Sequence, residues 1–453
     1  MKRALIAPLF LAGMATLAIA APAAAETVAI VNARIETASA AGIIPSGTIV
    51  LKDGRIAAVG AGVTAPAGAR VIDAQGGVVT PGLIAPSSNL TVSEVEAVPS
   101  TRDDRSGKLS AGFDISYGVN PASPMIPLAR QTGLTRVVAT PLLSRGGAGG
   151  HKDDGGAEDF AGGGGGEEGD PAMFAGQAAI VSLAAGDQDP VVRARVAVTL
   201  DLGEAGARNA GGSRGAALVL VRAAFQDARA LARNRNAYER GESREFGLSR
   251  IDLEALIPVV EGRTPLLVRV HRASDILQVL RLAREEKVRV ILEGAEEGWL
   301  VAGEIAAAGV GVILDSQADL PDSFESLGAR LDNAARLRAA GVTVAIMGSR
   351  DVNNLRQQRF NAGLAVANGL PRDQAMATIT SDVARIWGMT GVGSLTVGQE
   401  ADVVLWTGDP LETSSWPQAV FIGGVEQPQS TRAFELRDRY LKPAASGYPP
   451  AYQ

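Results

Sequence analysis

The chain has 453 residues, of which 46% are hydrophobic, and its formal net charge is -6. This length is enough for a large core and for more than one domain. The mild acidity and the aromatic content of 4% exclude the basic, aromatic-rich surface that nucleic-acid binding needs, so no nucleic-acid partner is expected.

The first residues form a targeting signal. Lys2 and Arg3 precede an apolar run over residues 4–20, and an Ala-rich cleavage pattern ends at Ala25. This pattern is typical of a secretory signal peptide. A membrane anchor is disfavoured because the Ala-rich run barely reaches the ~17–25 residues that span a bilayer. We therefore expect residues 1–25 to be removed and the mature protein to be periplasmic or secreted, without a stable membrane span.

Both ends of the mature chain carry a β pattern. Residues 26–80 are short β-branched runs broken by Gly, Pro and Asp, and Asp53-Gly54 between two apolar runs predicts a two-residue hairpin. Short apolar strands return within residues 392–453. We expect the two ends to meet in one composite β-sandwich domain.

Between these ends, strands alternate with helices, which favours parallel βαβ units. The sequence predicts an α/β fold with a (β/α)8 TIM barrel over residues 81–391. A strand is expected at 135–140 and a solvated Arg-rich helix at 214–240. The later strands are expected at 265–270, 288–292, 310–314 and 342–347, and the later helices at 274–286, 298–308 and 324–340.

One segment of the barrel region has a different composition. Half of residues 146–169 are glycine, and several like-charged carboxylates accompany them. Such a segment buries too little apolar surface to offset its backbone entropy, so residues 146–170 are predicted to be a disordered loop at the barrel rim. Its acidic residues and His151 could bind a cation weakly, but a solvated loop is the favoured interpretation.

Cysteine and histidine usage restricts the chemistry. The chain has no cysteine, which excludes disulfides, and two histidines, His151 and His271. Hydrolytic zinc sites usually take three protein ligands, most often imidazoles. A binuclear site rich in histidine is therefore excluded.

Several motifs carry a family resemblance. They are LKDGRIAAVG at 51–60, VTPGLI at 79–84, GLTRVVATP at 133–141, HRASDI at 271–276 and GSLTVGQEADVVLW at 393–406. Through them the chain resembles the amidohydrolase superfamily, in particular its secreted imidazolonepropionase-like group. The resemblance implies the barrel and composite domain above. It also implies one or two divalent metals and hydrolysis of a non-peptide C–N bond, such as an amide or lactam, in a small molecule.

The resemblance also places the metal site. The His-x-His pair of the first barrel strand becomes Ser87 and Asn89, and the His-x-His-Arg run after the fifth strand becomes Arg269-Val270-His271-Arg272. The sixth strand ends at Glu293 without a histidine. The expected metal ligands are His271 and Glu293, holding one divalent ion, plausibly zinc, or none.

The remaining site residues follow from the same positions. Asp351, displaced by one residue from the family's Gly-Thr-Asp, is the candidate proton acceptor. Candidate substrate-binding residues are Ser87, Asn89, Arg269, Arg272 and Arg350. Purely structural roles remain open: a rim hydrogen bond for His271, an ion pair with arginine for Glu293 and a turn or cap for Asp351.

Two kinds of function remain open. The first is an exported amidohydrolase with a degenerate metal site and reduced or lost catalysis. The second is a non-catalytic barrel, which either pairs with an active homologue or binds a small anionic ligand through its arginines. A homo-oligomer is equally compatible with the sequence.

Overall fold

The computed structural model describes residues 26–143, 172–318, 321, 323–348 and 352–441. Several predictions concern residues outside these ranges and are not tested by the structure. They are the signal peptide, the disordered loop with His151, and the roles of Arg350 and Asp351.

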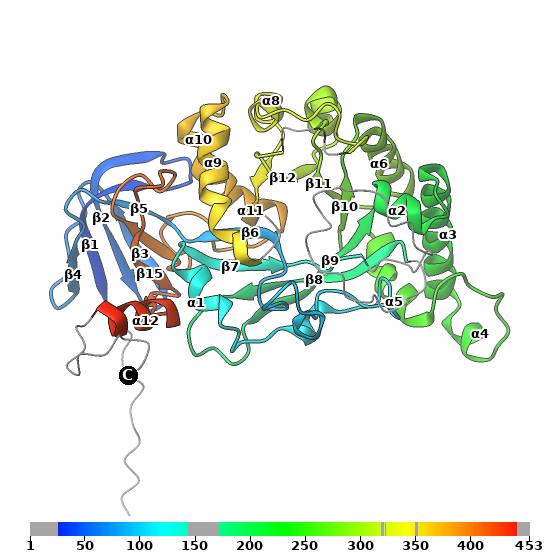
Figure 1. Ribbon diagram of the computed structural model, residues 1–453, viewed down its shortest axis with the longest axis horizontal. Helices are drawn as coiled ribbons and strands as arrows, with labels where there is room; N and C mark the ends of the chain where they lie inside the picture. Colours follow the sequence, from blue (N-terminus) through cyan, green and yellow to red (C-terminus); the bar gives the residue numbers. More distant parts are fainter. Residues whose placement is uncertain (1–25, 144–171, 319–320, 322, 349–351, 442–453) are drawn as a thin grey trace, which may run out of the picture.

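The two ends of the chain form one eight-stranded sheet, seen beside the barrel in Figure 1. The strand order is β16-β15-β14-β5-β1-β2-β3, with β4 also paired to β1. The join is the antiparallel pair of β5 and β14. The strands are β1 (Val28–Glu36), β2 (Ile43–Lys52), β3 (Arg55–Gly60), β4 (Arg70–Asp73), β5 (Val78–Pro81), β14 (Val403–Trp406), β15 (Pro417–Ile422) and β16 (Val425–Glu426).

The predicted hairpin lies between β2 and β3. Lys52 pairs with Arg55, so Asp53 and Gly54 make a two-residue turn, and both have positive φ, 50° and 75°. Those values suit an Asp-Gly turn because glycine adopts them freely and Asp tolerates them. The hairpin and the composite β domain predicted from the sequence are confirmed.

The second sheet is a nearly closed barrel of eight strands in the order β13-β12-β11-β10-β9-β8-β7-β6. Most neighbours are parallel, as predicted. The strands are β6 (Leu83–Ser88), β7 (Leu134–Ala139), β8 (Phe174–Ser182), β9 (Val191–Asp201), β10 (Leu266–Val270), β11 (Val290–Gly294), β12 (Gly311–Leu314) and β13 (Val344–Ile346).

One strand departs from the regular (β/α)8 pattern. β8 is antiparallel to both β7 and β9. A short connection over residues 183–190 joins β8 to β9, and a parallel pair would need a crossover of a dozen residues or more. The early half of the barrel is thus less regular than the later half, and the predicted eight-stranded barrel is confirmed.

Two features close the barrel. The buried side chain of Gln358 donates through Nε2 to Ile84 O on β6 (2.8 Å) and to Ile346 O on β13 (3.1 Å), which links the first and last strands. The N-terminal end of the barrel is covered after helix α11, where Arg193 Nη2 donates to Trp387 O (2.7 Å). The C-terminal strand ends are thus the end left for a site.

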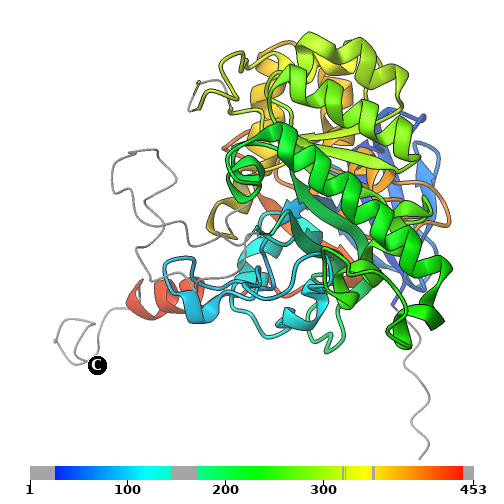
Figure 2. The ribbon, with the colours of Figure 1, turned by 90° about the vertical axis from the view of Figure 1, so that its right-hand side faces the viewer.

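Helices surround the barrel, and Figure 2 shows the long green helix α3 lying across its outside. The α-helices are α1 (Met125–Arg130), α2 (Glu204–Asn209), α3 (Arg214–Arg233), α4 (Arg235–Glu239), α5 (Arg250–Val260), α6 (Ala273–Glu286), α7 (Ala302–Ala307), α8 (Asn333–Ala339), α9 (Gln358–Ala367), α10 (Arg372–Thr378), α11 (Ser381–Ile386) and α12 (Arg432–Leu441). Short 3-10 turns are η1 (Pro99–Thr101), η2 (Ile115–Gly118), η4 (Gly298–Val301) and η5 (Val352–Gln357). Within the described residues, no helix is long and apolar enough to cross a membrane.

Two predicted helices differ from the structure. The helix expected over 214–240 breaks at Asn234 into α3 and α4. The helix expected over 324–340 is helical at Asn333–Ala339, and residues 323–332 form a loop. In that loop Gly328 N donates to Glu297 Oε1 and Gly328 O accepts from Trp299 Nε1, so both backbone groups bind side chains outside a helix.

Candidate functional site

Polar side chains gather at the C-terminal ends of four barrel strands. Ser87 is on β6, Thr140 directly follows β7, and Arg269 and Glu293 are register partners on β10 and β11. Because side chains alternate along a strand, Arg269 shares the face of Leu267, which belongs to the core that fills the barrel. These groups therefore point into the barrel near its mouth.

The four side chains form one network across that mouth. Arg269 Nε donates to Glu293 Oε1 (3.0 Å), and Arg269 Nη2 donates to Pro141 O (2.8 Å). Glu293 Oε2 accepts from Ser87 Oγ (3.0 Å), and Ser87 Oγ lies 2.8 Å from Thr140 Oγ1. All four residues are buried, with Arg269 6% and Glu293 4% exposed. The arginine pairing considered for Glu293 is thus present.

The donor set among the described residues does not fit the divalent metal that the resemblance implies. A guanidinium cannot ligate a metal, and neutral hydroxyls are poor ligands for zinc. If Glu293 turned to a cation, Arg269 would lose its carboxylate in a buried position, which is strongly unfavourable. Among the residues that the structure describes, no group of three or more His, Asp, Glu or Cys side chains could hold a metal ion.

His271 makes different contacts from Glu293. It follows β10, and its Nδ1 lies 2.6 Å from Glu296 Oε2 while its Nε2 lies 3.7 Å from Glu325 Oε1. Burial would lower the pKa of His271, but the hydrogen bond and charge of Glu296 and the charge of Glu325 raise this pKa to about 9. A proton therefore competes with any metal ion for this imidazole.

Glu325 lies in the loop 323–332 and reaches back to the barrel rim. Its Oε2 accepts from Glu204 N (2.7 Å) and from Arg214 Nη2 (3.1 Å). Burial raises the pKa of Glu325, while the charge of His271 and the two hydrogen bonds oppose that rise. One carboxylate thus joins α2, α3 and the end of β10.

The other predicted binding residues also contact carboxylates. Arg272 Nη2 donates to Asp275 Oδ1 (2.9 Å) at the start of α6, and its side chain is 40% exposed. Asn89 is buried and donates to Glu96 Oε1 (2.8 Å). Arg272 is thus a partly exposed rim residue, and Asn89 bonds to the segment that follows β6.

Sequence reasoning missed four residues of the mouth. Thr140 and Glu296 each follow a strand closely, so a search for polar residues at strand ends could have found both. Glu325 and Arg214 had no such signal. One lies in a loop predicted as helix, and the other begins a helix rich in arginine.

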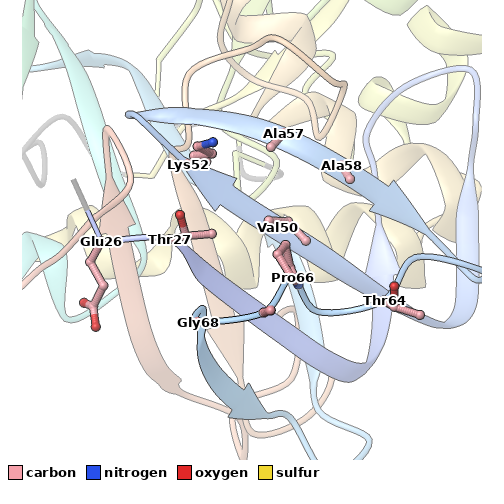
Figure 3. A pocket seen from close by; sticks show the side chains of 10 residues that line it. Glu26, Thr27, Val50, Lys52, Ala57, Ala58, Thr64, Pro66 and Gly68 are labelled. Carbon is pink, nitrogen blue, oxygen red and sulfur yellow. The ribbon is translucent and has the colours of Figure 1, made fainter. Parts of the chain in front are cut away.

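A separate hollow of about 490 Å³ lies on the composite sheet, shown in Figure 3. It is lined by residues of β2 and β3 and of the segment around Pro66, away from the barrel strand ends. Its charged lining residues, Glu26 and Lys52, are exposed. The hollow is therefore not part of the barrel site.

Comparison with solved structures identifies the class of fold. An amidohydrolase from Thermotoga maritima matches with a TM-score of 0.74 and 21% identity, over 88% of this chain and 99% of that one. Molinate hydrolase matches with a TM-score of 0.51 and 18% identity, over 94% and 98%. A prolidase bound to N-methylphosphonate-L-proline matches with a TM-score of 0.50 and 15% identity, over 89% and 100%.

The chain therefore has the amidohydrolase fold, and the resemblance predicted from the motifs is confirmed at that level. No protein-family model matches the sequence. No curated protein matches it by sequence either.

Proposed function

We propose that this chain is an exported member of the amidohydrolase superfamily whose barrel mouth binds a small molecule. In it, the family's metal-dependent hydrolysis of non-peptide C–N bonds is reduced or lost. The observation that carries the proposal is the buried Arg269–Glu293 ion pair, which crosses to Ser87 on the opposite side of the barrel.

The ion pair affects catalysis because it occupies the place where a metal ion would activate water. A divalent cation brings the pKa of bound water toward neutrality and polarises the carbonyl under attack. Here a fixed guanidinium stands at a ligand position, and its charge is already balanced by Glu293. Because the metal-dependent route forms hydroxide on the bound ion, we place the protein's activity in binding.

A hydrolysis assay with added zinc tests this proposal. The mature protein would be incubated with a panel of small amides, cyclic amides and carbamates, with Zn²⁺ supplied and in parallel with a chelator. We expect no turnover that depends on zinc. Zinc-dependent turnover that the chelator abolishes would contradict the proposal, and the paired reactions control for background hydrolysis.

Export is part of the same proposal and rests on the sequence of residues 1–25. Mass spectrometry of the protein recovered from its native host would locate the mature N-terminus. We expect it at Glu26, directly before β1. An intact Met1 on the accumulated protein would contradict export.

A further inference from the structure

The loop 323–332 places a carboxylate where a ligand could bind. We propose that Arg214, His271 and the backbone N–H of Glu204 form a binding site for the carboxylate of a small monocarboxylic acid, which the chain's own Glu325 occupies. The inference rests on the proposed function, because it assumes that the barrel mouth binds a small molecule.

Two hydrogen-bond donors and the ring of His271, from three different elements, converge on Glu325. The Glu204 N–H, in α2, and Arg214 Nη2, in α3, both donate to Oε2, at 2.7 and 3.1 Å. His271 Nε2, after β10, faces Oε1 at 3.7 Å. A backbone N–H, a guanidinium and an imidazole around two oxygens form the kind of arrangement that recognises a carboxylate.

The backbone leaves room for this carboxylate. A Cβ added to Gly203 would lie 2.9 Å from Glu325 Oε2 and 3.0 Å from Oε1, so a side chain there would push this carboxylate aside. Gly294, with φ of +93°, lies close to His271, because an added Cβ would lie 2.7 Å from Nδ1. Glycine at both positions lets the chain close around the carboxylate and the imidazole.

The surrounding charges indicate which anion fits. Arg214 also contacts Asp275 Oδ2 at 3.0 Å and Glu204 Oε1 at 3.6 Å, and Glu296 binds the other nitrogen of His271. Each cation is therefore already balanced in part. A second negative charge on the ligand would meet these carboxylates, so the site favours a monocarboxylate over a phosphate or a dicarboxylate.

The loop that carries Glu325 has a separate anchor. Gly328 is bound on both sides, its N–H by Glu297 and its carbonyl by Trp299. Phe324 and Leu327 beside Glu325 are 83% and 61% exposed, so little apolar burial holds this part of the loop. A ligand carboxylate can thus displace Glu325 without detaching Gly328.

Chemical rescue tests the site directly. Glu325→Ala removes the side chain beyond Cβ, and acetate has the size of the missing group. Thermal unfolding would be followed with sodium acetate, with acetamide as the neutral analogue and with NaCl at equal ionic strength. We expect acetate to raise the Tm of Glu325→Ala in a saturable way, and to do much less for the wild type, where Glu325 competes.

Three further variants locate the effect. Glu304→Ala, which removes an exposed carboxylate on α7, should behave as the wild type. Glu325→Gln should respond little because its amide still fills the site. The double variant Arg214→Ala, Glu325→Ala should lose the response. A Glu325→Ala response no larger than that to NaCl would overturn the proposal, and so would an equal response in Glu325→Gln.

This test needs neither metal nor turnover. If acetate does not stabilise Glu325→Ala, the proposed carboxylate site is disproved, and the result of the hydrolysis assay still stands. Conversely, zinc-dependent turnover would contradict the proposed function without changing the acetate response.

Discussion

Arg269 places a permanent positive charge inside the barrel at the end of β10, and the surrounding residues have the composition that this charge requires. Glu293 supplies the opposite charge, Pro141 O accepts from the second nitrogen, and Ser87 donates to the far oxygen of Glu293. A buried ion pair is stable when such additional hydrogen bonds satisfy it. Arg269 is therefore part of a network of buried side chains and not an isolated charge.

Removing one partner of this ion pair should destabilise the folded protein much more than removing both partners. Arg269→Met removes the buried guanidinium that binds Glu293 Oε1 and should lower the free energy of unfolding by about 3–5 kcal/mol. The double variant Arg269→Met, Glu293→Gln should recover a large part of that loss. Urea denaturation measures both, and Arg289→Met, at an exposed arginine, is the matched control. A single-variant loss below about 1 kcal/mol would show that the pair is not strongly coupled.

The raised pKa of His271 predicts that the stability of the protein depends on pH. Its pKa is raised from 6.5 to about 9 in the folded protein, since the charges of Glu296 and Glu325 outweigh the effect of burial. The resulting stabilisation is fully present below pH 6.5, because folded and unfolded states are then both protonated. It falls as pH rises from 6.5 and is lost above about 9.

Comparison with His271→Gln isolates this contribution. The difference in free energy of unfolding between the wild type and the variant should shrink by about 1–3 kcal/mol between pH 6 and pH 9.5. Urea titrations at several pH values measure it. A difference that stays constant across this window would mean that His271 titrates normally.

At the scale of elements, Gln358 replaces the missing ladder between the first and last barrel strands. Its amide donates to both β6 and β13 from a buried position. Gln358→Ala leaves two buried carbonyls without this donor and should lower the free energy of unfolding by about 1–3 kcal/mol. Gln188→Ala, at an exposed glutamine, should change it by less than about 0.5 kcal/mol. Equal effects of the two variants would contradict this role.

The elements that the sequence predicted well are those with strong local signals. Asp53-Gly54 has the residues that its turn requires, and the barrel strands after residue 265 are short apolar runs bounded by turns. The direction of β8 was not predictable locally, because a buried strand has the same composition whichever way it runs. The loop 323–332 was mistaken for helix because contacts of Gly328 with distant side chains hold it in a series of turns.

The candidate site was predicted in part for the same reason. Ser87, Arg269 and Glu293 stand at strand ends, so their positions at the mouth followed from the motifs. Their mutual contacts did not, because Ser87 and Glu293 are 206 residues apart in the chain and meet across the barrel. Glu325 depends on a loop path that only the folded chain defines.

At the scale of the whole molecule, the barrel and the composite sheet share buried contacts. Trp406 on β14 is fully buried, and a Cβ added to Gly133, just before β7, would lie 2.6 Å from its ring. Arg136 on β7 pairs with Asp402 (2.8 Å) and with Glu400. The two parts should therefore unfold together.

Gly133→Ala tests this junction. Gly133 has φ of +89°, and alanine there must also displace Trp406, so the free energy of unfolding should fall by about 2–4 kcal/mol. Gly186→Ala is the matched control, since Gly186 has φ of +77° with open space around it. Circular dichroism and tryptophan fluorescence should report one coincident transition. An equal loss in both variants would mean that the Trp406 contact contributes little.

The metal content of the purified mature protein tests the central claim most directly. After dialysis against Zn²⁺ and removal of free ion, elemental analysis should find well under one equivalent of zinc, because the Arg269–Glu293 pair occupies the barrel mouth. The variant Ser87→His, Asn89→His, measured in parallel, shows whether restoring the first-strand histidines is enough to bind zinc while Arg269 remains. One tightly bound equivalent in the wild type would contradict the account.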